Sequence, residues 1–162
     1  MNKKILGVDV GGVIIDGRRN DNTDTSFKGV RFLETTSVQN AFESLRELNS
    51  RFNGLIYVVL KCGLATELKT RKWLAHHNFY DITRILPADI YYCRERQEKA
   101  PICEFLGITH FIDDGMEVLS YLKSVPNKYL FYSEEENEKC AIYPDLSFIR
   151  ADSWEEILNL IK

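Results

Sequence analysis

A short apolar run near the N-terminus ends in a carboxylate. Asp9 closes the run, and Gly11 and Gly12 turn the chain before apolar residues resume at Val13. A run bounded by such a turn is typical of a buried strand in a parallel sheet. Asp9 would then lie at the carboxyl end of the strand, where open α/β sheets bind their ligands. An aspartate before glycine is at least as often a turn cap, so Asp9 alone does not decide between the two readings.

A second strand end has the same layout. The apolar run that begins at Thr109 ends in Asp113 and Asp114, and Gly115 follows. If both runs are strands of one parallel sheet, their carboxylates meet at one edge. Like charges at that distance repel strongly unless a cation or protons neutralise them, and oxygen ligands of this kind suit Mg²⁺. The sequence therefore predicts a divalent metal site that includes Asp9.

The elements that position these residues alternate between strand and helix. This alternation favours an α/β fold with a doubly wound parallel sheet in three layers, α/β/α, and we expect one domain over residues 1–162. Residues 17–36 form a polar loop or flap that is longer than an ordinary connection, so it is a candidate for function. Beyond the two acidic strands, the expected elements are a helix from Ser37 to Asn49 or Ser50, strands 54–60, 89–93, 128–132 and 147–150, and helices 65–76, from Pro101, from Met116 and from Ser153 with a capping box.

Composition and charge exclude several classes of protein. The 162 residues are 44% hydrophobic and 28% charged, as in a globular domain with a real core. A formal net charge of −3 argues against a general nucleic-acid binder, and the arginines at 18–19 read as solvated surface charge. No apolar stretch approaches the length of a membrane span, and no signal-peptide pattern is present. The four cysteines form no C-x-x-C pair, so we expect reduced thiols, mostly in the core, and a cytoplasmic location.

Two adjacent histidines invite a metal-site interpretation. His76 and His77 come at the end of an expected helix, where successive side chains point about 100° apart and cannot easily share one ion. A helix C-terminus also favours histidine electrostatically. We therefore expect a structural role for this pair.

Four short motifs, in this order, resemble those of the HAD (haloacid dehalogenase-like) hydrolase superfamily over nearly the whole chain. The first is the Asp-Val-Gly-Gly-Val stretch at 9–13, and the second is the strand end at 58–61. The third is a basic residue before the last motif, for which Lys99 is the candidate, and the fourth is the Phe-Ile-Asp-Asp stretch at 111–114. The resemblance implies a Rossmann-like fold. Because no stretch is long enough for a full cap domain, it also implies a capless member with an open site.

The resemblance also assigns roles to these residues. Asp9 would be the nucleophile that forms an aspartyl-phosphate, and Lys99 would keep it ionised. Lys99 could instead be an ordinary surface lysine in a charged loop, which is the commoner situation for lysine. Mg²⁺ would be held by Asp9, the backbone carbonyl of Gly11, and Asp113 or Asp114. The substrate phosphoryl group would contact the residues Gly11, Gly12, Leu60 and Lys61.

Two motif positions depart from the family pattern. The second aspartate of motif one, which serves as general acid and base, is Gly11 here, and that role is worth about 10²–10⁴-fold in rate. Asp16 is the nearest spare carboxylate, although its place in the following turn makes rescue by it improbable. The motif-two Ser or Thr is Leu60, which cannot hydrogen-bond a phosphoryl oxygen. Cys62 lies on the same strand face as Leu60 under period-2 alternation, but a thiol is a weak donor.

Three functions remain open at this point. The first is a slow or specialised Mg²⁺-dependent phosphohydrolase that acts on a phosphorylated small molecule or a macromolecular end. The second is a non-catalytic relative that binds a phosphorylated ligand, a metal or a protein partner. The third is a carbon–halogen hydrolase, which needs no metal and is a minor possibility because such enzymes tend to lack the paired Asp113–Asp114 motif.

Overall fold

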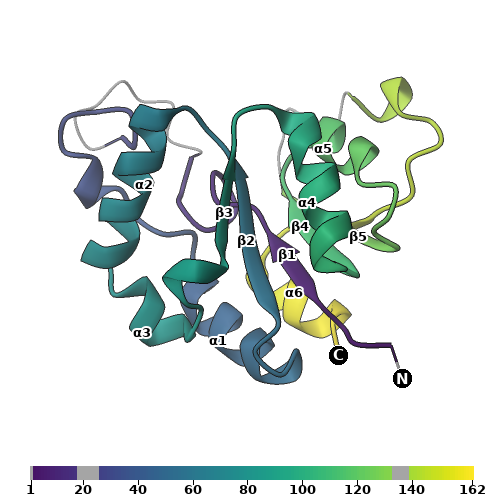
Figure 1. Ribbon diagram of the computed structural model, residues 1–162, viewed down its shortest axis with the longest axis horizontal. Helices are drawn as coiled ribbons and strands as arrows, with labels where there is room; N and C mark the ends of the chain where they lie inside the picture. Colours follow the sequence, from purple (N-terminus) through teal and green to yellow (C-terminus); the bar gives the residue numbers. More distant parts are fainter. Residues whose placement is uncertain (1, 18–25, 133–138) are drawn as a thin grey trace.

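A parallel sheet organises the protein. The computed structural model describes residues 2–17, 26–132 and 139–162, and within these ranges six parallel strands follow the order β3-β2-β1-β4-β5-β6 (Figure 1). The first strand is therefore central, and the chain reverses its direction of winding beside it. This confirms the predicted α/β fold class. The strands are β1 Leu6–Val8, β2 Ile56–Lys61, β3 Ile90–Cys93, β4 His110–Asp113, β5 Asn127–Phe131 and β6 Ile149–Ala151.

Helices cover both faces of the sheet. Residues of α1, α2, α3 and α6 pack into one hydrophobic cluster, and residues of α4 and α5 pack into the other, which gives the expected three layers. The described helices are α1 Ala41–Arg51, α2 Leu64–His76, α3 Phe79–Thr83, α4 Lys99–Leu106, α5 Met116–Tyr121 and α6 Trp154–Leu160, with short 3₁₀ turns η1 Phe32–Glu34, η2 Pro87–Asp89 and η3 Arg96–Glu98. No helix in the described ranges is both long and apolar enough to cross a membrane.

The first predicted helix starts later than its hydrophobic spacing indicated. We expected it to begin at Ser37, but α1 begins at Ala41. Ser37 instead forms an antiparallel bridge with Ile15, and the Val38 amide donates to the Ile14 carbonyl at 2.8 Å. Val38 is still in the core, as the helical spacing predicted. The first residues of the predicted helix, however, pair with the turn after β1. The tertiary hydrogen bonds outweigh the local helical pattern.

The loop that we expected over 17–36 is partly structured. Positions 18–25, including both arginines, lie outside the described residues, and the rest contains the turn η1. The Leu33 carbonyl lies 2.7 Å from His77 Nε2, and the His77 ring stacks on Trp73 at 4.1 Å between centroids. His77 thus serves packing, as the sequence indicated for the histidine pair.

The last helix is capped as predicted, with one difference. Ser153 Oγ accepts a hydrogen bond from the Glu156 amide at 3.2 Å, but the Glu156 carboxylate accepts from the Asp152 amide rather than from that of Ser153.

This helix also brings Trp154 under the turn that follows Asp9. Its Nε1 donates to the Val13 carbonyl at 2.8 Å, and the side chain is buried.

The Trp154–Val13 hydrogen bond should contribute measurably to stability. Trp154→Phe keeps an aromatic ring but leaves the buried Val13 carbonyl without this donor, so we expect the free energy of unfolding to fall by about 1–3 kcal/mol. Urea denaturation followed by circular dichroism would measure the change. Leu160→Ala, at a partly exposed position of the same helix, is the matched control and should have a smaller effect.

Candidate active site

Asp9 stands at the carboxyl end of the central strand. β1 ends at Val8, and the Asp9 amide donates to the Ile112 carbonyl of β4 at 3.0 Å, which fixes the two strand ends side by side. The chain then turns so tightly that the Val10 carbonyl accepts from the Ile14 amide at 2.8 Å. The strand-end position predicted for Asp9 is therefore the one observed.

Gly12 allows the turn to pass close to the second acidic strand. Its φ is +75°, a left-handed conformation that side chains other than glycine rarely adopt. A Cβ atom at this position would also overlap Asp114 Oδ2. Gly12 thus brings the turn after Asp9 against the acidic pair, and only glycine fits at this position.

Lys99 is the counter-ion of the acidic cluster. Its side chain is only 2% exposed, and Nζ donates to Asp9 Oδ1 at 2.9 Å and to Asp113 Oδ2 at 2.8 Å. Burial alone would lower the pKa of Lys99, but the charges of Asp113 and Asp9 raise it above its ordinary value, so the ammonium stays protonated. The alternative of a solvated surface lysine is wrong.

The position of Lys99 in the chain also differs from the expectation. The sequence suggested a charged loop, but Lys99 is the first residue of α4. The preceding turn η3 carries a capping box in which the Glu98 carboxylate accepts from the amides of Arg94 and Glu95 at 2.8 and 2.9 Å. A Glu-x-x-Glu pattern at 95–98 was a readable signal for this helix start. The capped turn therefore directs Lys99 inward.

Three carboxylates converge beside this ammonium. Ligand oxygens of Asp9, Asp113 and Asp114 all lie within 4.8 Å of one another. Burial and the Asp9 charge raise the pKa of Asp113 to about 6, although Lys99 partly opposes the shift. Burial and the charges of Asp9 and Asp113 raise the pKa of Asp114 to about 8. Both pKa shifts thus arise first from burial and then from neighbouring carboxylates, and Lys99 opposes them only in part.

The donor set fits a divalent cation. Three carboxylates face one ammonium, so the fully ionised cluster carries an excess of two negative charges. Hard carboxylate oxygens from two strand ends are the ligands that Mg²⁺ takes in proteins. Asp113 is already held by Lys99 and by the Gly115 amide, which donates to its Oδ1 at 3.0 Å, whereas Asp114 faces the Gly12 turn.

If this cluster holds Mg²⁺, we expect stability to depend on both pH and Mg²⁺. In the unfolded chain both carboxyls titrate near pH ~4, so between that value and about 8 the folded state binds more protons than the unfolded state. Without Mg²⁺ these groups should make the melting temperature fall as the pH rises through this window. A Mg²⁺ ion held by these carboxylates would compete with protons for them, so it should raise the melting temperature more at pH ~8.5 than at pH ~5.5.

Thermal unfolding with and without Mg²⁺ would measure both effects, and Asp114→Asn is the matched control because it removes the group with the higher pKa. The variant should show a flatter pH dependence and a smaller Mg²⁺ shift. An equal Mg²⁺ shift in the two proteins at both pH values would contradict a cation site that includes Asp114.

Two cavities meet at the acidic cluster. One, of about 440 Å³, is lined by the charged residues Asp9, Lys99, Asp113 and Asp114, and by the Arg96–Glu117 ion pair at 2.9 Å. The other, of about 310 Å³, lies on the α2 side, and its walls include Ile15, Phe27, Leu60, Cys62, Thr66 and Thr70. The first cavity can hold a cation and an anionic group, and the second can hold an organic group.

The predicted substrate-binding residues are divided between these spaces. Gly11 and Leu60 line the smaller cavity, Lys61 lines both, and Gly12 faces Asp114. Leu60 is buried, so the apolar side chain noted in the sequence faces this cavity. Gly11 is exposed, and a Cβ atom there would meet no atom within 4 Å. The space for a side chain at position 11 is open.

The cavities are lined by two residues that the sequence analysis singled out, Cys62 and Asp16, and by others that it missed. Cys62 lines the smaller cavity beside Leu60, as period-2 alternation predicted, and burial raises the pKa of its thiol, which keeps it protonated. Asp16 lines the same cavity. Arg96 and Glu117 were missed. Each lies three residues from a motif position, Lys99 or Asp114, so helical spacing could have placed it beside the site. Phe27 was missed because no local pattern marks its burial.

Comparisons with known proteins agree with this fold. No protein-family model and no curated protein matches the chain. A solved haloacid dehalogenase-like hydrolase from Burkholderia xenovorans LB400 matches over 98% of this chain and 97% of its own, with 10% identity and a TM-score of 0.64. A solved dehalogenase with an intermediate complex matches over 99% of this chain and 98% of its own, with 12% identity and a TM-score of 0.66. The chain therefore has the HAD-like fold that its motifs indicated.

Proposed function

We propose that this chain is a HAD-like hydrolase, and that it is a Mg²⁺-dependent phosphohydrolase acting through an aspartyl-phosphate. The observation that carries the proposal is the convergence of Asp9 with Asp113 and Asp114 around the buried ammonium of Lys99. Its substrate is a phosphorylated small molecule or a macromolecular end that reaches the open edge of the sheet.

Each residue of the cluster has a distinct role in this proposal. Asp9 is the nucleophile, because it lines both cavities and its carboxylate accepts a hydrogen bond from the Lys99 ammonium. Asp9, Asp113, Asp114 and the Gly11 carbonyl would hold Mg²⁺, which supplies positive charge for the oxygens of the transferring group. Lys99 orients Asp9 and Asp113 and balances their charge. The phosphoryl group would lie near Gly11, Gly12, Leu60 and Lys61.

The departures from the motif pattern set the expected rate. Gly11 offers no carboxyl to protonate the leaving oxygen, and Leu60 offers no hydroxyl to the phosphoryl group. Loss of a general acid is worth about 10²–10⁴-fold in rate, and loss of one transition-state donor about 2–4 kcal/mol. We therefore expect slow turnover that favours substrates with good leaving groups.

A direct experiment is phosphate release from 4-nitrophenyl phosphate with Mg²⁺ or with chelator. Mg²⁺-dependent release by the wild type and its loss in Asp9→Asn would support the proposal, as would a phosphorylated Asp9 trapped by rapid quench. Glu43→Gln, an exposed change far from the cluster on α1, is the control. Release at the same rate in wild type and Asp9→Asn would contradict it.

Two other functions have their own supporting observation. The loss of acid and donor at Gly11 and Leu60 also suits a non-catalytic protein that binds a phosphorylated ligand or partner. Calorimetry would then show Mg²⁺ or phosphate binding without turnover, and a trapped aspartyl-phosphate would rule this function out. The dehalogenase among the structural neighbours favours a carbon–halogen hydrolase, for which halide release in chelator is the test. The acidic cluster argues against the latter, because it leaves negative charge uncompensated without a cation.

A further inference from the structure

The two cavities are joined at a single place. Among the described residues that line them, only Asp9 and Lys61 belong to both. The larger cavity carries the acidic cluster and Lys99, while the smaller one is lined mainly by apolar and hydroxyl side chains. If Asp9 is the nucleophile, the bond that it breaks lies at this junction. Lys61 is then the other residue next to that bond.

The strand geometry places Lys61 and Asp9 on the same face of the sheet. Along β2, Val58 and Leu60 pack in the α1–α2 cluster, whereas Val59 packs in the α4–α5 cluster. Lys61 continues the alternation on the Val59 face. Leu6 and Val8 pack in the α1–α2 cluster, so Asp9 also faces α4, where it meets Lys99.

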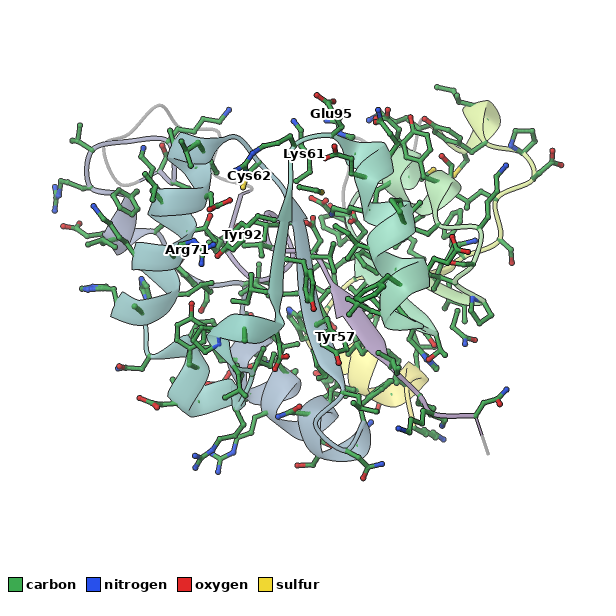
Figure 2. All side chains as sticks on the ribbon, in the orientation of Figure 1. Tyr57, Lys61, Cys62, Arg71, Tyr92 and Glu95 are labelled. Carbon is green, nitrogen blue, oxygen red and sulfur yellow. The ribbon has the colours of Figure 1, made fainter. Side chains whose placement is uncertain are left out.

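The register sets how far Lys61 reaches beyond Asp9. Val8 pairs with Val58, so β2 continues three residues past the last paired residue of β1. Lys61 is the last residue of that extension and is exposed. Figure 2 shows it at the carboxyl end of β2, at the upper edge of the sheet. The Lys61 side chain therefore begins beyond Asp9, on the side from which a substrate would approach.

Lys61 differs from the other cations around the larger cavity. Lys99 is held by Asp9 and Asp113, and Arg96 by Glu117. Lys139 also lines this cavity, and it too has an interaction partner. Within the described ranges the Lys61 side chain makes no hydrogen bond or ion pair, so its ammonium is available to a ligand. An available cation at the junction is suited to an oxygen on which negative charge develops.

We propose that Lys61 hydrogen-bonds the oxygen of the leaving group and stabilises its charge, while the leaving group occupies the 310 Å³ cavity. This inference rests on the proposed function. An Asp9 oxygen forms a bond to phosphorus as the bond to the leaving oxygen breaks. The electron pair stays on that oxygen, which departs paired with the Lys61 ammonium and takes a proton from water after release. Water then attacks phosphorus, the Asp9 carboxylate is regenerated, and the phosphate keeps both protons of the water.

The smaller cavity also indicates the class of substrate. A volume of about 310 Å³ is at the lower end for ligand pockets, which favours a compact leaving group. Phe27 and Leu60 offer apolar contact, and Thr66 and Thr70 carry hydroxyls, although the Thr70 hydroxyl donates to the Thr66 carbonyl at 2.8 Å. Asp16 and Lys28, which carry opposite charges, also line this cavity. The substrate class is thus a phosphate monoester of a small alcohol or phenol.

Two aryl phosphates with leaving groups of different acidity test the role of Lys61. Phenol is a much weaker acid than 4-nitrophenol, so the phenoxide oxygen carries more charge that needs stabilisation. Lys61→Met should lower kcat/KM about 100-fold or more for phenyl phosphate and less than about tenfold for 4-nitrophenyl phosphate. Lys61→Arg, which keeps the charge, should retain activity on phenyl phosphate within about tenfold of wild type. Lys72→Met, an exposed lysine of α2 that lines neither cavity, is the matched control.

The outcomes separate this inference from the function on which it rests. Suppose that Asp9→Asn abolishes turnover, but Lys61→Met loses activity equally on both substrates or loses none. That result would overturn the role of Lys61 and leave the proposed function standing. Failure of Lys61→Arg to restore phenyl phosphate turnover would overturn the charge-stabilising role. Absence of any Asp9-dependent release from either substrate would overturn the proposed function. Circular dichroism of each variant would confirm that it folds.

Discussion

Lys99→Met is expected to lower the free energy of unfolding by about 3–5 kcal/mol near pH 8 and to remove Mg²⁺-dependent turnover. Lys99 is buried between Asp9 and Asp113, and methionine fills much of its volume without its charge. The two carboxylates would then be buried together with no cation between them, which is far more costly than losing a surface pair. Urea denaturation and phosphate release from 4-nitrophenyl phosphate would measure the two effects.

The pH dependence of this loss identifies its cause. Burial and the Asp9 charge raise the pKa of Asp113 to about 6, so this carboxyl takes up a proton at low pH. The repulsion then weakens, and the difference from wild type should shrink toward pH ~5. Mg²⁺ should restore part of the stability near pH 8, because it supplies charge to the same oxygens. Lys72→Met is the control for removal of an exposed lysine. A loss of stability that is constant across this pH range would indicate lost packing rather than lost charge.

The acidic cluster could be predicted because each strand end carries its own local signal. Asp9 and Asp113 each follow an apolar run and stand two residues before a glycine. Because parallel strands end at one edge of the sheet, the fold class was enough to predict that they meet. Lys99 was found only through motif order. Its burial depends on how α4 packs against the sheet, and composition around it indicates a solvated loop.

The rest of the site depends on tertiary packing. Phe27 belongs to a polar segment without periodicity. Thr66 and Thr70 line the smaller cavity because α2 turns that side toward the segment that follows β1. The same reason explains why α1 begins late, since Val38 is held by a backbone hydrogen bond to Ile14. Local patterns therefore identified the residues that strands carry to the edge, and missed those that loops and helices bring to it.

Gly11→Asp should raise kcat on phenyl phosphate by about 10²–10⁴-fold, which is the contribution of a positioned general acid. The backbone allows this change, because Gly11 is not among the glycines with positive φ and a Cβ atom there meets nothing within 4 Å. Gly11 lines the cavity assigned to the leaving group, so a carboxyl here can reach the leaving oxygen. Phosphate release by purified Gly11→Asp and by Gly11→Asn, which has the same size but no acid, would measure the effect.

A gain shared by Gly11→Asp and Gly11→Asn would show that the side chain acts without proton transfer and would contradict this account. The same variant also tests Lys61, because an acid at position 11 and the Lys61 ammonium would act on one oxygen. Residues that share a partner give non-additive effects. Gly11→Asp should therefore increase the rate more in the Lys61→Met background than in the wild type, since a protonated leaving group no longer needs a cation. Equal gains in the two backgrounds would mean that positions 11 and 61 act on different atoms of the substrate.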